Sequence, residues 1–330
     1  QSLLELGPAS FAAGGGLSRA YGSFGKPNTY AAYLELSAPL LLALAGWGFG
    51  QIVEQLRAYR KTRLHGMVAS RAERAGVIWW TGFTLWMAVC ALAGLVGIVL
   101  SFSRGAWLGT AAGLLAMLLV SARGLPIARV AVAGVVAVVL LTGGMRYAPE
   151  AVQERYEQLV SQVRLFDARQ VIVTPENFAA VERMAHWQTG IAMFQAEPLL
   201  GVGVGNFNGR FRDFQVHPGF PTSAGHAHNY YIQAAAETGT LGLAVYLWLI
   251  GTALAIALRA ARTTRDALSR AVGLGAVGVT VALMVHNVVE NLHVLSLGIQ
   301  LAAIWALAVL ALYNPPWSGV AQAEEGTNSA

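Results

Sequence analysis

The stretch from residue 226 to residue 243, HAHNYYIQAAAETGTLGL, places several polar side chains at the start of an apolar run. His226 and His228 are separated by one residue, and Asn229, Gln233 and Glu237 follow at intervals of four. Residues four apart lie on one face of a helix, so these three form a polar stripe of about two turns, or roughly 12 Å. A stripe of that depth predicts a polar cleft between helices.

The histidine pair is open to three interpretations. A histidine with an ordinary pKa of about 6.5 can take a proton from a hydroxyl group at neutral pH, which favours a general base. The two rings could also bind a metal ion with help from His217, His286 or His293, although the chain has three aspartates and no D-x-D pattern. They could instead cap the helix and contact lipid headgroups.

Two arginines lie near the expected outer boundary of the membrane. Arg104 is part of SFSRGAWLG, and Arg183 is part of ERMAHWQTGIAMFQAEPLLGVGVGNF. An arginine at this position is costly unless it is paired or lines a wet cavity, although a single one is often explained by snorkelling to headgroups. Two guanidinium groups near a histidine pair favour forked hydrogen bonds to a phosphate or a pyrophosphate.

Two further motifs are less specific. His286 and Glu290, four residues apart, could face the same cleft, and a hydrogen bond between helices explains them equally well. The run GVGVGNF has no strand–turn–helix context, so it does not indicate nucleotide binding. Its glycines suit close backbone packing or a turn around a phosphate.

The composition shows which elements must position these residues. The 330-residue chain is 55% hydrophobic and 12% charged, and its mean hydropathy is +0.52. Soluble domains carry about a quarter charged residues, so the chain is expected to be a polytopic membrane protein. The net charge of +5 is concentrated in a few loops and indicates topology, with no nucleic-acid partner. Cys90 is the single cysteine and cannot form a disulfide within the chain.

The expected fold class is an all-α bundle of transmembrane helices. A span needs roughly 20 apolar residues. Seven runs qualify: 30–50, 77–100, 105–121, 127–143, 230–258, 271–290 and 293–313. The expected organisation is spans 1 to 4 in residues 1–143, a loop subdomain in 144–229, spans 5 to 7 in 230–313 and a disordered cytoplasmic tail in 314–330.

Basic residues predict the orientation of the bundle. The loops 51–76, 121–129 and 259–270 carry six, two and four basic residues, whereas the short segments on the other side carry Arg19, Lys26 and Arg104. Basic loops stay in the cytoplasm, so the segment 144–229 is expected outside it. The spacing of apolar residues in 146–166 predicts an amphipathic helix within that segment.

Four motifs occur in an order that resembles one protein family. GSFGKPNTYAAYL, SFSRGAWLG, ERMAHWQTGIAMFQAEPLLGVGVGNF and HAHNYYIQAAAETGTLGL are similar to the O-antigen ligase and O-antigen polymerase family, which includes bacterial protein O-oligosaccharyltransferases. The resemblance covers about residues 17 to 243 and continues weakly through the last two spans. It implies a metal-independent, inverting glycosyltransferase without a cofactor. The implied donor is a glycan on undecaprenyl pyrophosphate, used at the outer face of the bacterial inner membrane.

The resemblance also assigns roles to residues. It implies that Arg104 and Arg183 hold the pyrophosphate. It also implies that His228 is catalytic, because Asn229 follows it and Gly239 comes after nine intervening residues. Possible supporting residues are His226, Asn229, Gln233 and Glu237. The implied acceptor is a hydroxyl group of another glycan, of the lipid A core or of a protein. Members of this family resemble bundles of ten or more spans, so further N-terminal spans are expected.

Two other functions remain open. A transporter or flippase of lipid-linked sugars also needs polar stripes within a bundle, but it would place them near the midplane of several spans. The polar groups gather on one side of this chain, which favours the transferase. A metal-sensing or metal-carrying membrane protein built around HAH is the third candidate.

Overall fold

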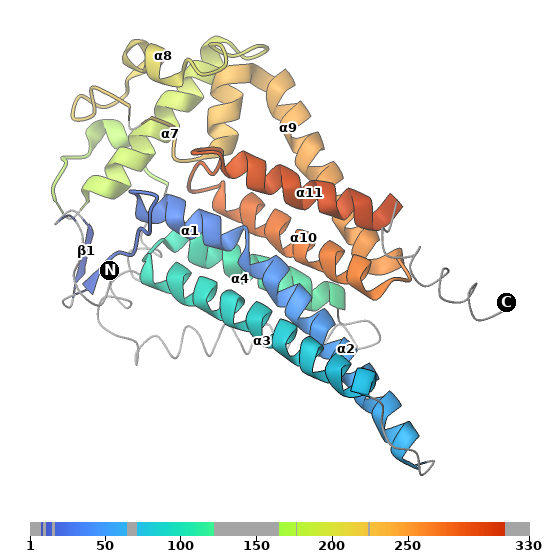
Figure 1. Ribbon diagram of the computed structural model, residues 1–330. Coiled ribbons are helices and arrows are strands. Elements are labelled where there is room, and N and C mark those ends of the chain that lie inside the picture. Colours follow the sequence, from blue (N-terminus) through green and yellow to red (C-terminus); the bar gives the residue numbers. More distant parts are fainter. Residues whose placement is uncertain are drawn as a thin grey trace.

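A computed structural model describes most of the chain as a helical bundle with a smaller helical part at one end (Figure 1). The described residues are 8, 11–14, 17–64, 71–121, 165–175, 177–223 and 225–313. Their elements are β1 (Ala12–Gly14), β2 (Leu17–Ser18), α1 (Pro27–Glu35), α2 (Ala38–Leu64), α3 (Arg71–Leu100), α4 (Arg104–Ser121), the short 3-10 helix η4 (Ala168–Gln170), α7 (Phe178–Ala196), α8 (Phe207–Phe214), α9 (Tyr230–Thr263), α10 (Ala267–His286) and α11 (Leu297–Tyr313). The strands β1 and β2 form a small antiparallel pair.

The helices confirm a multi-pass membrane protein. Within the described residues, five helical stretches are long and apolar enough to cross a membrane: Pro27–Thr62, Arg74–Leu100, Arg104–Ser121, Tyr230–Thr263 and Ala267–His286. The apolar helix α11 is shorter, with 17 residues. The span expected at 127–143, most of the amphipathic helix expected at 146–166 and the tail 314–330 lie outside the described residues. The expected number of seven spans is therefore not confirmed.

Two boundaries differ from the sequence expectation. Residues 51–76, expected as a loop, are mostly helical, because α2 continues to Leu64 and α3 begins at Arg71. Arg57 and Lys61 are exposed on this extension, and both residue types are good helix formers in water. The run expected to span 271–290 instead leaves the helix after His286. Glu290 consequently lies in the turn between α10 and α11.

Helix α10 lies at the centre of the described bundle. It packs against α2, α4, α9 and α11, and most of its length is buried. Small residues permit these close contacts: Gly275 faces Leu40 of α2, and Gly278 lies against Pro39 and Met117. Small residues at helix contacts are the usual means of close packing in membranes, where apolar side chains gain little from leaving lipid.

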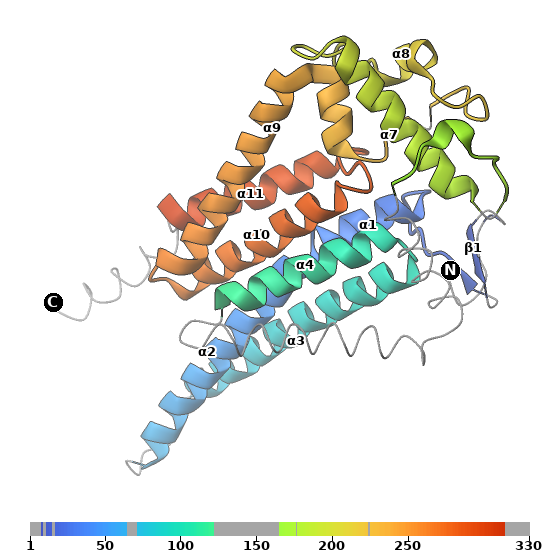
Figure 2. The same ribbon diagram turned by 180° about the vertical axis from the view of Figure 1, so that it is seen from behind.

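The helices α7 and α8 lie beyond one end of the bundle (Figures 1 and 2). At that end α3 and α10 finish and α4 and α9 begin, whereas the basic end of α2 and the turn from α9 to α10 lie at the opposite end. The arrangement therefore places the four polar motifs near one another, at the end that carries α7.

A kink in α9 connects the bundle to α7. Gly239 has φ 64° and ψ −163°, a backbone conformation that is essentially restricted to glycine. The turn after α7 closes against the kink, where Val202 N–H donates to Ala236 O at 2.9 Å and Thr240 N–H donates to Pro198 O at 2.8 Å. A Cβ atom on Gly239 would collide with the backbone of Leu199. The turn thus supplies partners for backbone groups that the kink removes from the helix.

We predict that Gly239→Ala destabilises the protein by roughly 2 kcal/mol or more, because the substitution combines backbone strain with a collision between two backbones. Thermal unfolding in detergent should show a clearly lower Tm. The matched control is Gly251→Ala on the same helix, where a Cβ meets nothing within 4 Å and helix propensity improves slightly. Equal Tm values for the two variants would contradict the assigned role of the kink.

Candidate functional site

A cavity of about 930 Å³ lies where α4, α7, α9 and α10 meet. It brings together Arg104, Arg183 and His228, the three residues to which the family resemblance assigns main roles. Its other polar lining residues are Arg19, Asn28, Ser103, Glu182, Tyr231, His286 and Glu290. The apolar part of the lining includes Leu108, Met284 and Val288. A lining with both polar and apolar residues suits a ligand with a charged head group and a lipid chain.

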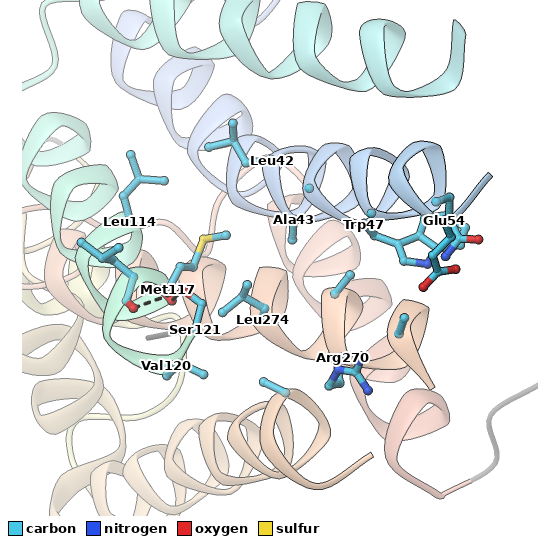
Figure 3. A pocket seen from close by; sticks show the side chains of 17 residues that line it. Leu42, Ala43, Trp47, Glu54, Leu114, Met117, Val120, Ser121, Arg270 and Leu274 are labelled. Atoms are coloured by element: carbon cyan, nitrogen blue, oxygen red, sulfur yellow. Dashed lines mark hydrogen bonds between the residues drawn. The ribbon is translucent and has the colours of Figure 1, made fainter. Parts of the chain in front are cut away.

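A second cavity of about 620 Å³ lies among α2, α4 and α10, toward the basic end (Figure 3). Leu42, Met117 and Leu274 line its apolar part, and Glu54 and Arg270 lie toward one end. None of the site residues expected from the sequence lines it. The first cavity is therefore the candidate functional site.

The break between α3 and α4 positions Arg104. Ser101 Oγ–H donates to Ile98 O at 2.6 Å, and the same oxygen accepts from Ser103 N–H at 3.1 Å. Phe102 has a positive φ of 52°, which is uncommon for a residue other than glycine. This turn starts α4 at Arg104, so the N-terminus of an 18-residue helix faces the cavity. The helix dipole adds partial positive charge at that position.

Helix α7 presents Arg183 and Trp187 to the cavity. Burial lowers the pKa of Arg183 below the ordinary value of an arginine, and the charges of Glu290 and Glu182 oppose this shift. The guanidinium stays charged at neutral pH, because an arginine pKa lies far above 7. Trp187 Nε1–H donates to the carbonyl oxygen of His228 at 3.1 Å. One helix therefore provides a cation and holds the segment that carries the histidine.

His228 has a strained backbone that its neighbours fix. Its φ is +54°, in the left-handed region, and such outliers cluster at functional sites. Asn229 Oδ1 accepts from Tyr231 N–H and Ile232 N–H, so Asn229 caps α9 directly after His228. Among the residues that the structure describes, none forms a hydrogen bond with Nε2 of His228. The nitrogen is thus an unpartnered polar atom on a ring that lines the cavity.

Glu290 lies beside both histidines of the HAHN motif. Its Oε1 is 3.4 Å from Nδ1 of His228 and 3.5 Å from Nδ1 of His226. Burial acts to raise the pKa of Glu290, but contact with the His228 side chain and electrostatic interactions with His228, His226 and Arg183 outweigh it and lower the pKa well below its usual range. The carboxylate is therefore ionised at neutral pH. It can orient His228 and stabilise a positive charge on that ring.

Asn28 and Arg19 complete the contacts of Glu290. Asn28 Nδ2–H donates to Glu290 Oε2 at 2.6 Å, and Arg19 Nη2–H donates to Asn28 Oδ1 at 2.6 Å. Arg19 Nε–H also donates to Ser101 O at 2.9 Å, next to the break that starts α4. Sequence reasoning missed Arg19 and Asn28 as site residues. The sequence indicated them only weakly, because Asn28 is part of a turn motif at the start of α1 and Arg19 is a single arginine in a short segment.

His226 is held as a neutral ring. Burial lowers its pKa to about 4; Glu290 opposes this shift, whereas the charges of His228, Lys26 and Arg183 reinforce it. Its Nδ1 accepts from the backbone N–H of His228 at 3.1 Å. His226 does not line the cavity and instead supports the backbone of His228.

The stripe on α9 holds the loop that carries His228. Gln233 Oε1 accepts from Ala227 N–H at 2.7 Å, and Gln233 Nε2–H donates to Glu237 Oε1 at 2.8 Å. Glu237 Oε1 also accepts from Phe207 N–H at 3.1 Å, at the start of α8. Asn229, Gln233 and Glu237 are absent from the lining of the cavity that the structure describes. They act on the site through the backbone.

A metal ion has one candidate position among the described residues. Ligand atoms of His226, His228 and Glu290 lie within 4.8 Å of one another. However, Glu290 Oε2 already accepts from Asn28, and Nδ1 of His226 accepts from a backbone N–H. The charge of Arg183 also acts on this group. These contacts engage Glu290 Oε2 and Nδ1 of His226, whereas among the described residues no hydrogen bond reaches either ring nitrogen of His228.

The neutral histidines predict how stability depends on pH. His186 on α7 is fully buried, its Nδ1 lies 2.7 Å from Glu182 O, and burial lowers its pKa to about 4. Between pH 6.5 and 4 the unfolded chain takes up a proton that the folded chain refuses, so stability falls as the pH falls.

We predict a lower Tm at pH 5 than at pH 7 and a smaller difference for His186→Asn, which keeps a donor for Glu182 O and does not titrate. The measurement is thermal unfolding in detergent at both pH values. The difference between the two Tm values is decisive, because the substitution can lower both. An unchanged difference would contradict the buried neutral state of His186.

Comparison with known families finds a match to this chain. Residues 88–247 match the family model described as O-antigen ligase. None of the curated proteins matches the chain. The matched segment contains Arg104, Arg183 and His228, whereas Glu290 and Asn28 lie outside it. The family implies a glycosyltransferase-type enzyme that acts on lipid-linked glycans. Through residues 88–247, this multi-pass membrane protein belongs to the O-antigen ligase family.

Proposed function

We propose that the protein transfers a glycan from undecaprenyl pyrophosphate to an acceptor hydroxyl group, at the periplasmic face of the bacterial inner membrane. The observation that carries this proposal is the convergence of Arg104, Arg183 and His228 on one cavity, although they come from three separate segments. Cations for a pyrophosphate and a base for a hydroxyl are the two requirements of this reaction. The partly apolar lining is suited to the membrane lipid and to the first units of the carrier chain.

The proposed mechanism is a single displacement. His228 Nε2 accepts the proton of the acceptor hydroxyl while its oxygen attacks the anomeric carbon. The bond from that carbon to the pyrophosphate oxygen breaks, and the pyrophosphate leaves with the electron pair. Arg104 and Arg183 neutralise the charge that develops on the leaving group. Attack from the opposite side inverts the anomeric centre.

Glu290 would support His228 during proton transfer. Its ionised carboxylate lies 3.4 Å from Nδ1 of His228, so it can stabilise the imidazolium that forms. Asn28 holds the other carboxylate oxygen and keeps it away from the reacting groups. No step of this mechanism requires a metal ion or a cofactor, so transfer should proceed in EDTA.

One prediction of this mechanism concerns the role of His228 as the general base. Purified protein should release the carrier and join the glycan to an acceptor in detergent with EDTA, and His228→Ala should lower this rate about 100-fold or more while donor binding is retained. Release of carrier pyrophosphate and the glycosylated product are both measured. A His228→Ala variant with full transfer activity would refute the role of His228 as the general base.

The same assay separates the alternatives. An intact donor with wild-type protein, across several acceptors, would favour a transporter, and flipping in vesicles would then test that function. Loss of activity in EDTA with recovery in zinc would favour a metal site at His226, His228 and Glu290. If transfer occurs, substitution of lipid A core, glycan and protein acceptors distinguishes a ligase, a polymerase and a protein transferase.

A further prediction of this mechanism concerns Arg104 and Arg183. Arg104→Ala and Arg183→Ala should each weaken binding of a lipid pyrophosphate about 10-fold or more, because each removes charge-assisted hydrogen bonds. The matched control is Arg210→Ala on α8, which removes an exposed arginine that is paired with Asp213 and does not line the cavity. Equal affinity for all three variants would exclude a pyrophosphate site at the two arginines.

A further inference from the structure

A second histidine–carboxylate pair lies beside the candidate cavity, which His286 lines. Nδ1 of His286, the last residue of α10, is 2.5 Å from Oε2 of Glu35, the last residue of α1. The side chains are 1% and 0% exposed. Neither residue has a part in the mechanism proposed above.

The pair is expensive to bury. A carboxylate inside a membrane bundle loses its hydration, and one partner compensates for only part of that loss. Glu35 Oε1 has no hydrogen-bond partner among the described residues. Well-packed apolar side chains in place of such a pair are often at least as stable, so stability alone does not account for it.

Helix α4 leaves space for this pair. A Cβ atom on Gly105 would collide with the imidazole of His286, and one on Gly109 would collide with Glu35 Oε1. The two glycines are four apart, so they lie on one face of α4. That face therefore fits closely against the pair.

The free nitrogen of His286 lies beside the N-terminus of α4. Nδ1 is engaged by Glu35, and in the described part of the chain Nε2 has no hydrogen-bond partner. The His286 ring lines the cavity, and Nε2 faces Gly105, the residue after Arg104. The first N–H groups of a helix lack partners within the helix and attract anions. A buried imidazole thus accompanies a helix N-terminus that already carries an arginine.

We propose that the pyrophosphate of the carrier lipid binds at the N-terminus of α4 and that Nε2–H of His286, oriented by Glu35, donates a hydrogen bond to it. Glu35 is a positioning residue, because it acts by keeping a proton on Nδ1 and thereby turning Nε2 toward the cavity. With Nδ1–H paired to the Glu35 carboxylate and Nε2–H facing the phosphate, the ring is a third donor beside Arg104 and Arg183. This inference rests on the proposed function and identifies a phosphate-binding group of the same site.

The proposed subsite predicts that variants of His286 and Glu35 lose the ability to discriminate a pyrophosphate lipid from a monophosphate lipid. Wild-type protein in detergent should bind a polyprenyl pyrophosphate more tightly than the corresponding polyprenyl monophosphate. His286→Gln and Glu35→Gln should each weaken binding of the pyrophosphate lipid about 10-fold and leave the monophosphate lipid nearly unchanged. The double variant should bind the pyrophosphate lipid no more weakly than His286→Gln alone, because Glu35 acts through His286.

Two further variants separate this role from a structural one. Gly105→Ala keeps both ionisable groups but displaces the His286 ring, so it should give the same loss of discrimination. Thr280, also on α10, accepts a buried hydrogen bond from Trp305 of α11 and does not line the candidate cavity. Thr280→Val removes this bond and should keep the wild-type ratio of pyrophosphate to monophosphate affinity. The proposal would be overturned if the ratio of pyrophosphate to monophosphate affinity stayed unchanged in His286→Gln, Glu35→Gln and Gly105→Ala. Equal weakening of binding for both lipids in these variants would also overturn it.

Glycan transfer, measured alongside, separates the two proposals. Wild-type transfer with an unchanged ratio in the variants would reject the role of His286 and leave the proposed function intact. Loss of discrimination in the variants without any transfer by wild-type protein would support the pyrophosphate subsite and reject the transferase.

Discussion

The buried carboxylate of Glu290 is the interaction on which the geometry of the candidate site depends. An ionised carboxylate at the edge of a membrane bundle needs partners for both oxygens. Its partners are Asn28 from the start of α1 and the histidines that precede α9, so one side chain joins three segments. The turn after α10 carries Glu290 to this position, which a continuous helix through residue 290 would not do in the same way.

The same requirement, that buried polar groups find partners, organises the surrounding backbone. The kink at Gly239 opens α9, and the turn after α7 occupies the opening with its own N–H and C=O groups. Gln233 and Glu237 satisfy N–H groups of the segments that lead to His228 and to α8. Helix α7, with Arg183, is therefore fixed to the bundle by backbone contacts as well as by the buried apolar cluster that includes Met193 and Ala236.

Positive and negative groups gather at the cavity or directly beside it. Arg19, Arg104 and Arg183 contribute cations, and Glu290 and Glu35 contribute carboxylates, each close to a histidine. The two histidine–carboxylate pairs differ in their surroundings. The pair at His228 lies at the end of the bundle with loop segments around it, whereas the pair at His286 is enclosed by α1, α4 and α10. This difference is consistent with a reacting group at the first pair and a fixed binding group at the second.

The sequence by itself determined the membrane class, the positions of most apolar helices and the family. Hydropathy and local motifs are properties of neighbouring residues, so they can be read along the chain. The family prediction from four ordered motifs was confirmed, and the roles of Arg104, Arg183 and His228 stay predictions that the cavity supports. Only the tertiary structure decided that Asn28 meets Glu290, 262 residues away, and that Glu35 meets His286, 251 residues away. Periodicity indicates that a side chain is buried, but the partner it meets depends on how distant helices pack and where each of them ends.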